Sequence, residues 1–284
     1  MNTDFRNAIT NRKSVRNYTP AVPETDILVR VQNLLKSNNT GPFGNSSRFW
    51  IIDKSGYAEQ RLKLGTYGFI KGASIYFAGA MKADTPMNHE DYGYVKERKI
   101  LEFTNIQLGT CWIGGTFRRS EFAKTIHLHD NEIISTISPL GLALPETGMG
   151  KIIKSLAGSY KRKVFGDLFF ENTFENSIVF NELNPIHQAL EMVRLGPSAN
   201  NAQPWRILLQ NEMAHFYLAR NKAIDTLKKV DLQRVDMGIA MCHFELSLRE
   251  CGISGKWMLN NPNSVAPKNL QYICSFSIET QQIF

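Results

Sequence analysis

The sequence predicts a mixed α+β protein built from two unequal copies of one domain. Strand-like runs alternate with amphipathic helical stretches along the chain, a pattern that the α/β class would also give. A ten-residue loop occurs twice, at residues 41–50 and 196–205, and the two copies share Gly, Pro, Asn and Trp at an offset of 155 residues. Because a second pair of similar segments follows in the same order, we interpret the repeat as an internal duplication.

Each copy of the loop lies between a helix and a strand. Apolar residues share one helical face over residues 27–35 before the first loop and over residues 186–193 before the second. The runs 50–52 and 206–209, directly after the two loops, are typical of strands. The match between the copies therefore extends to local structure.

The second pair of similar segments supports the same division. Residues 103–112 and 246–257 each read as the end of an apolar helix, then a glycine, then a tryptophan, at an offset of 143 to 145 residues. We expect a first half over residues 1–170 and a shortened second half over residues 171–284, joined near residues 170–184. Two such copies should pack as the subunits of a homodimer do, with the ligand cleft between them. The remaining strand-like runs are 74–79, 133–144, 215–219 and 272–278.

Composition excludes several classes of protein. The 284 residues are 43% hydrophobic and 21% charged, which is typical of a globular chain and excludes disordered, collagen-like and coiled-coil proteins. The longest apolar stretches, 69–81 and 133–145, are shorter than the about 20 residues that span a membrane. The N-terminus has no apolar signal region, so we expect a cytoplasmic protein. The four cysteines form no C-x-x-C pair, and we expect them to be reduced packing residues.

The net charge of +7 is concentrated in two short segments. Residues 6–16 carry four positive charges and residues 151–163 carry five, and neither segment contains an acid. Such focused charge suits a small phosphate-bearing ligand, whereas a nucleic-acid surface would need a longer basic stripe with aromatic residues. Two solvated basic faces are the alternative.

Two motifs contain the polar groups of a ligand site. In the segment 12–18, two arginines flank a serine and could together bind phosphate oxygens, although a basic surface turn would have the same sequence. In the loop 196–205, Gly-Pro ends the preceding helix, and Ser, Asn and Gln then supply donors and acceptors for hydroxyl groups or a heterocycle.

Together with Leu108-Gly-Thr-Cys-Trp-Ile-Gly-Gly115, these motifs resemble the FMN-dependent nitroreductase family. The resemblance covers residues 5 to about 260 and is closest to the branch in which a shortened second copy follows the first. It implies a nitroreductase-like α-β-α sandwich. In ordinary members, the flavin lies at a homodimer interface, between the arginine-serine segment of one subunit and the Ser-x-x-Asn-x-Gln-Pro-Trp loop of the other.

The two halves of this chain differ in what they retain of that pattern. The first half has the arginine-serine segment, but its loop has Phe43, Arg48 and Phe49 at the serine, glutamine and proline positions. The second half has the intact loop and no second arginine-serine segment. The resemblance therefore implies one FMN per chain, in a monomer with internal pseudo-twofold symmetry.

The resemblance also assigns roles to positively charged residues. Arg12, Ser14 and Arg162 match the phosphate ligands, and Lys13 matches a contact to the ribityl chain. Arg16 matches the cation near flavin N1 and O2, where negative charge collects on reduction.

The flavin ring is expected to lie against backbone. Ile113, Gly114 and Gly115 match the segment that directs an N–H at flavin N5, with Gly114 standing where many relatives have glutamate. Tyr67 and Gly68 are expected under the pyrimidine edge.

The second-half loop completes the set of cofactor residues that we expect. Ser198 and Asn200 should contact the ribityl chain or the ring, and Gln203 should support the loop. Pro197 and Ala199 belong to the same turn.

The function that the resemblance implies is hydride transfer from NADH or NADPH to FMN, followed by reduction of a small organic acceptor such as a nitroaromatic or quinone in a ping-pong cycle. No catalytic acid or base is expected, because the protein needs only to position the donor and tune the flavin. A flavin-binding or regulatory module without turnover is the alternative. A third possibility is related flavin chemistry that needs a substrate-covering lid. We expect no metal site, since no third ligand accompanies His127 and His129, and no nucleic-acid or membrane partner.

Overall fold

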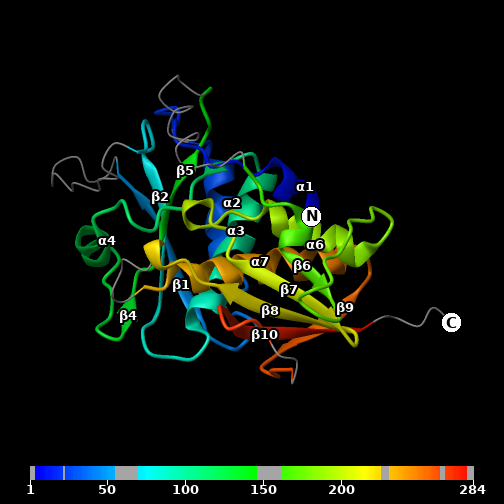
Figure 1. Cartoon of the computed structure of the whole chain (residues 1–284). Coiled ribbons are helices and arrows are strands. Elements are labelled where there is room, and N and C mark those ends of the chain that lie inside the picture. Colours follow the sequence, from blue (N-terminus) through cyan, green and yellow to red (C-terminus); the bar gives the residue numbers. More distant parts are fainter. Residues whose placement is uncertain are drawn as a thin grey trace.

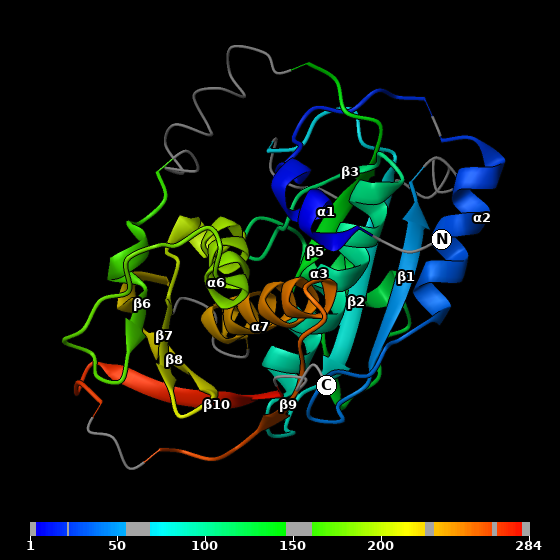
Figure 2. The same ribbon diagram turned by 90° about the vertical axis from the view of Figure 1, so that its right-hand side faces the viewer.

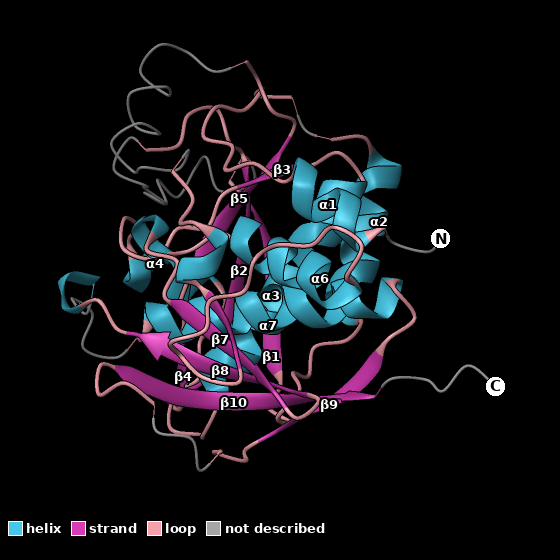
Figure 3. Ribbon diagram, turned by 45° about the vertical axis from the view of Figure 1, so that its right-hand side comes forward, coloured by secondary structure: helices cyan, strands magenta, loops and turns pink. Residues whose placement is uncertain are grey.

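The computed structural model describes residues 4–21, 23–54, 69–145, 161–224, 230–262 and 266–279. Within these ranges, two five-stranded sheets enclose two long helices, α3 (Asn88–Asn105) and α7 (Leu232–Glu250). Figures 1 and 2 show both helices running between the sheets, and Figure 3 shows the helices gathered at the centre of the molecule. The other α-helices are α1 (Phe5–Asn11), α2 (Thr25–Lys36), α4 (Arg119–Thr125) and α6 (Pro185–Leu195).

The two sheets have the same strand order. The first sheet runs β1-β2-β5-β3, with β4 paired to β2, and the second runs β6-β7-β8-β10-β9. The two sheets share one topology over four strands: β1 corresponds to β7, β2 to β8, β5 to β10 and β3 to β9. The first sheet contains β1 (Ser47–Asp53), β2 (Ile75–Lys82), β3 (Gly109–Thr110), β4 (Glu132–Ile133) and β5 (Ile137–Gly141). The second contains β6 (Phe169–Glu171), β7 (Trp205–Gln210), β8 (Met213–Ala219), β9 (Ser254–Met258) and β10 (Leu270–Glu279).

Alternation along β1 explains how the first sheet is covered on both faces. Phe49 and Ile51 contact the cluster that includes residues of α2 and α3, whereas Trp50 and Ile52 face the cluster that includes Phe122 of α4. Successive strand residues point to opposite faces, so an apolar run of this kind needs cover on both sides.

Strand β6 has no counterpart in the first sheet. It pairs in parallel with β7 and so adds the residues at the end of the expected first half to the second sheet. The expected boundary between residues 170 and 171 falls inside this strand.

The central helices approach closely where two glycines meet. A Cβ on Gly93 of α3 would lie 2.2 Å from the carbonyl oxygen of Val235, and one on Gly238 of α7 would lie 2.0 Å from that of Glu90. These glycines are 145 residues apart, which is the offset of the helix-end repeat in the sequence. Each helix thus presents its glycine to the backbone of the other, as equivalent elements do about a twofold axis.

The expected strand over residues 133–144 is wrong in its middle and at its end, where β5 stops at Gly141. It is interrupted between β4 and β5, where the guanidinium of Arg119 donates hydrogen bonds to the carbonyls of Ile134 and Ser135. The sequence analysis also missed α1, α4, β6 and β9, which are short or lack strong periodicity.

Other expectations from composition can be compared directly. None of the four cysteines forms a disulfide with a described residue. Cys111, Cys242 and Cys274 are buried, which confirms the packing role of these three, and Cys251 is half-buried. In the part of the chain that the structure describes, no helix is long and apolar enough to cross a membrane.

Candidate functional site

One face of α7 brings the two halves together. Leu232, Asp236 and His243 are spaced by four and seven residues and therefore lie on the same side of the helix. A Cβ on Gly114, from the first half, would lie 2.7 Å from Leu232. One turn further along, both carboxylate oxygens of Asp236 accept from the backbone N–H of Ala199, in the second half, at 3.0 and 3.1 Å. Two segments expected to share a ligand thus lie along one helix face.

The loop 196–203 has an unusual backbone conformation. Asn200, Asn201 and Gln203 all have positive φ, at 49°, 53° and 48°. Non-glycine residues rarely adopt this region, and asparagine does so more readily than most. Ser198 closes the turn, because its Oγ accepts from the Gln203 N–H at 2.9 Å.

A second basic segment fixes this loop from outside. Arg162 donates to the carbonyls of Leu195 and Gly196 at 2.8 and 2.7 Å and to Oδ1 of Asn201 at 3.0 Å. The Gln203 side chain accepts from the Lys163 N–H at 2.9 Å, which supports the expected structural role of Gln203. The side chain of Asn200 is exposed and makes no hydrogen bond to a described residue.

Arg12 reaches this region from the first half. It is the C-cap of α1, and its side chain is only 6% exposed. Its Nε lies 3.9 Å from the fully buried carboxylate of Glu97, an ion pair without a hydrogen bond. Among the described residues, neither Nε nor Nη1 has a hydrogen-bond partner. A buried donor without a partner is costly and is normally satisfied by protein, water or ligand.

The positive charge of Arg12 also helps to lower the pKa of Arg162. Burial, followed by the positive charge of Arg12, lowers the pKa of Arg162 to about 10. The two guanidinium groups are therefore close enough to repel each other. A dianion bound between them would reduce this repulsion.

Glu97 connects Arg12 to both halves. Its carboxylate lies 2.9 Å from Nε2 of His243 on α7 and accepts from Nε1 of Trp112 at 2.7 Å. Nδ1 of His243 donates to the Met192 carbonyl on α6 at 2.8 Å. Burial alone would raise the pKa of Glu97, but the hydrogen bonds and charges of His243, Arg12 and Trp112 hold it below its usual value. His243 is thus a buried histidine at the contact between the two halves.

The rest of the arginine-serine segment runs beside the first sheet. Ser14 forms a parallel bridge with Thr110 of β3, and Nη1 of Arg16 donates to the Ser14 carbonyl at 3.4 Å. Lys13 is exposed. The segment 55–68, which includes the expected Tyr67 and Gly68, lies outside the described residues.

The turn at residues 113–115 begins at the first sheet. Ile113 both donates to and accepts from the backbone of Ile137, at 2.9 and 3.0 Å. Its N–H is therefore engaged, and the amides of Gly114 and Gly115 remain as candidate donors from this segment. A Cβ on Gly115 would meet nothing within 4 Å.

A family model described as "Putative TM nitroreductase" matches residues 4–248. The chain belongs to this family. The expectation of a nitroreductase fold in a two-part chain is confirmed, because a solved structure of a "putative nitroreductase" from Thermotoga maritima covers 98% of the chain. That match has a TM-score of 0.59 at 19% identity and extends over 94% of the other chain.

Other solved structures of the nitroreductase family match only about half of this chain. A nitroreductase family protein from Clostridium novyi covers 50% of it, at 16% identity and a TM-score of 0.42, over 86% of its own length. An FMN-dependent nitroreductase from Clostridium difficile covers 49%, at 17% identity and a TM-score of 0.39, over 88% of its own length. No curated protein matches the chain.

The residues on this side of the chain fit a flavin phosphate. Nε and Nη1 of Arg12 are buried and lack partners among the described residues, and burial, followed by the charge of Arg12, lowers the pKa of Arg162. A phosphate dianion would accept from the first guanidinium and reduce the repulsion between the two.

The corresponding loop of the first half is anchored on α3 as the second-half loop is anchored on α7, but it carries a phenylalanine at the serine position. The carboxylate of Asp91 accepts from the N–H groups of Phe43 and Asn45 and from the Asn45 side chain, all at 2.9 Å. Phe43 packs against the main hydrophobic cluster. A Cβ on Gly41 would lie 2.4 Å from Cβ of Asp91, so the loop is closely packed on α3.

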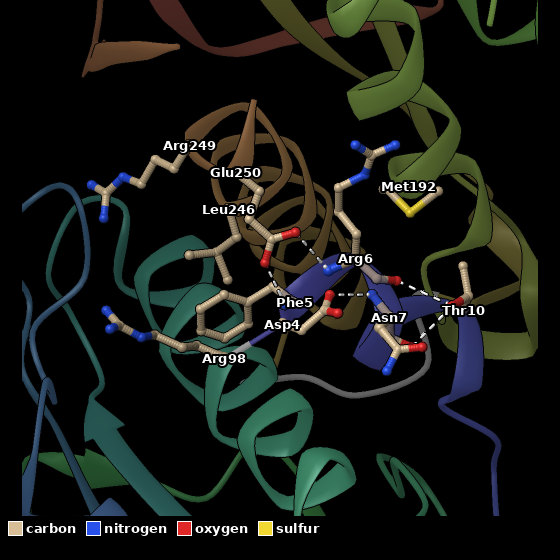
Figure 4. A pocket seen from close by; sticks show the side chains of 10 residues that line it. All are labelled: Asp4, Phe5, Arg6, Asn7, Thr10, Arg98, Met192, Leu246, Arg249 and Glu250. Carbon is tan, nitrogen blue, oxygen red and sulfur yellow. Dashed lines mark hydrogen bonds between the residues drawn. The ribbon is translucent and has the colours of Figure 1, made fainter. Parts of the chain in front are cut away.

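A separate pocket lies at the other end of α1. Figure 4 shows its lining residues, which enclose about 920 Å³ and include none of the expected cofactor residues. Glu250 on α7 accepts from the N–H groups of Phe5 and Arg6 and so fastens the start of α1 to the second half. This contact helps to place Arg12, at the end of the same helix.

The sequence analysis missed Asp236, Glu97 and Asn201. Asp91 and Asp236 are 145 residues apart, so aligning the two central helices would have identified both as loop anchors. Glu97 is one of four acids in α3, so the sequence alone does not single it out. Nothing in the sequence distinguishes the bonding of Asn201 from that of Asn200.

Proposed function

We propose that the chain is an FMN-dependent NAD(P)H oxidoreductase of the nitroreductase type that reduces a small organic acceptor in a ping-pong cycle. Membership of the family supports this assignment. Solved neighbours include proteins titled "FMN-dependent Nitroreductase" and "Putative NADH Oxidase" from Clostridium species, which is consistent with flavin chemistry.

The observation that carries the proposal is the position of Arg12. Its nearly buried guanidinium has unsatisfied donors and lies near Arg162, which holds the polar loop of the second half. In this proposal Arg12, Arg162 and Ser14 hold the phosphate of the cofactor, and Asn200 is free to contact the ribityl chain or the ring. Bound FMN would supply hydride acceptance at N5 and hydride donation to the second substrate.

The protein groups would orient and tune the cofactor. Arg16 would place positive charge beside N1 and O2, which favours the reduced flavin. Backbone amides of the 113–115 turn would face N5. No side chain is proposed as a nucleophile, acid or base, because the reaction needs a donor carbon held about 3 to 3.5 Å from its acceptor.

The visible spectrum of the purified protein tests this assignment. Flavin absorbance that bleaches on addition of NADH or NADPH and returns with a nitroaromatic or quinone is the expected result. Flavin that binds and does not bleach would favour the non-catalytic module. Failure to bind FMN would contradict both.

We also propose that the protein is cytoplasmic and that it acts as a monomer. The monomer is favoured because one chain contains both contributors to the site. Gel filtration coupled to light scattering should give a mass near 32.2 kDa for the flavin-loaded protein. A dimer with the site between chains would contradict this part of the proposal.

A further inference from the structure

Arg119 holds together two segments beside the candidate site. It lies at the start of α4, and its Nη2 donates to the carbonyls of Gly114 and Ser135 at 2.6 and 2.8 Å. Its Nε donates to the Ile134 carbonyl at 2.9 Å, and its guanidinium lies 4.6 Å from the ring centre of Phe117. Three carbonyls in this arrangement need the planar, forked donor set of arginine.

These contacts fix the direction of two backbone amides. A trans peptide unit points its N–H opposite to its C=O. The Ile113 carbonyl accepts from Ile137, so the N–H of Gly114 points away from that strand. The Gly114 carbonyl accepts from Arg119, so the N–H of Gly115 points away from Arg119. Neither amide donates to a described residue.

The turn lies against α7, close to the point where that helix holds the second-half loop. Gly114 abuts Leu232, one helical turn from Asp236, whose carboxylate holds the second-half loop. The space beside Gly115 is open. The charged donor also polarises the 114–115 peptide, because hydrogen bonds in a chain strengthen one another.

We propose that Arg119 is a positioning residue that orients the amides of Gly114 and Gly115 so that one of them donates to N5 of the flavin. This inference rests on the proposed FMN site. Arg119 would not touch the cofactor. It would control the direction of the backbone amide that donates to the reacting atom.

Arg119 carries its charge without a carboxylate partner among the described residues. Burial lowers its pKa, and the nearby Tyr92 acts weakly in the opposite direction. Its interactions are therefore almost entirely with backbone carbonyls, which suits a role in fixing the main chain.

The test compares the binding of FMN with that of 5-deaza-FMN, in which N5 is replaced by a C–H that accepts no hydrogen bond. One hydrogen bond should give the wild-type protein about a fivefold preference for FMN. Arg119→Met and Arg119→Lys should bring this ratio close to one, with Arg119→Lys included because a retained cation is less disruptive to folding. The exposed neighbour Arg118 provides the control, because Arg118→Met removes the same charge and should leave the ratio unchanged.

The binding of the two flavins distinguishes a failure of the Arg119 role from a failure of the proposed FMN site. A wild-type protein that binds neither flavin contradicts the proposed function itself. A wild-type protein that binds both equally, or Arg119 variants that keep the full preference, would overturn the positioning role and leave the FMN site standing. If Arg119 had only a structural role, its replacement would weaken the binding of FMN and of 5-deaza-FMN equally, and the ratio of the two affinities would not change.

Discussion

The contact between the two central helices gives the sharpest stability prediction. Replacing Gly238 by alanine would put a Cβ 2.0 Å from the Glu90 carbonyl oxygen and 2.8 Å from its carbonyl carbon and from the Tyr94 nitrogen. Ordinary contacts of a Cβ begin near 3.4 Å, so α3 and α7 would have to separate by more than 1 Å at this point. The obstructing atoms are backbone atoms of a helix and cannot rotate away.

The size of the effect follows from two opposing contributions. Overpacking a rigid core costs about 3 kcal/mol at the upper end of its usual range. Alanine in place of glycine within a helix returns about 1 kcal/mol. We therefore expect Gly238→Ala to lower the free energy of unfolding by about 2 kcal/mol, with FMN binding weakened as well because the site spans both halves.

Urea unfolding followed by circular dichroism measures this change. Gly115→Ala is the matched control, because its Cβ meets nothing within 4 Å and its effect should stay within about 0.5 kcal/mol. Gly93→Ala should behave like Gly238→Ala, since its Cβ would lie 2.2 Å from the Val235 carbonyl oxygen. A Gly238→Ala protein as stable as the wild type would refute the argument from the helix crossing.

Three further predictions concern the site and its pH dependence. Arg12→Ala should weaken FMN binding about 10- to 100-fold through loss of a charge-assisted contact, and fluorescence titration showing unchanged affinity would remove Arg12 from the phosphate site. Flavin absorbance per mole of chain should give a ratio near one, because the first-half loop has the core-packed Phe43 at the position of Ser198 and the second half has no arginine-serine segment. A ratio near two would reject the single-site assignment. Burial raises the pKa of Glu90 from 4.5 to about 7 despite its pairing with Arg234. The folded state therefore holds a proton that the unfolded chain releases, and stability should fall as pH rises from about 4.5 to 7. In the Glu90→Gln variant, the decrease in the free energy of unfolding over this pH range, measured by denaturation, should be smaller by up to about 3 kcal/mol. An unchanged pH dependence would contradict the assignment to Glu90.

Local pattern was sufficient for the elements with strong periodicity. The helical faces at residues 27–35 and 186–193 became α2 and α6, and the two copies of the Gly-Pro loop each precede a strand, β1 and β7. It was insufficient for residues 133–144, because the break between β4 and β5 depends on Arg119, a side chain from another element.

The sequence by itself determined that the chain is duplicated, that its positive charge is concentrated in two segments, and that one half keeps the arginines while the other keeps the loop. These are properties of residue order, and no folding is needed to see them. Only the tertiary structure decided that Glu97 contacts both Arg12 and His243, and that Gly93 and Gly238 meet at the helix crossing. Such contacts join residues far apart in the chain. They are set by the packing of whole elements, which no local pattern of residues specifies.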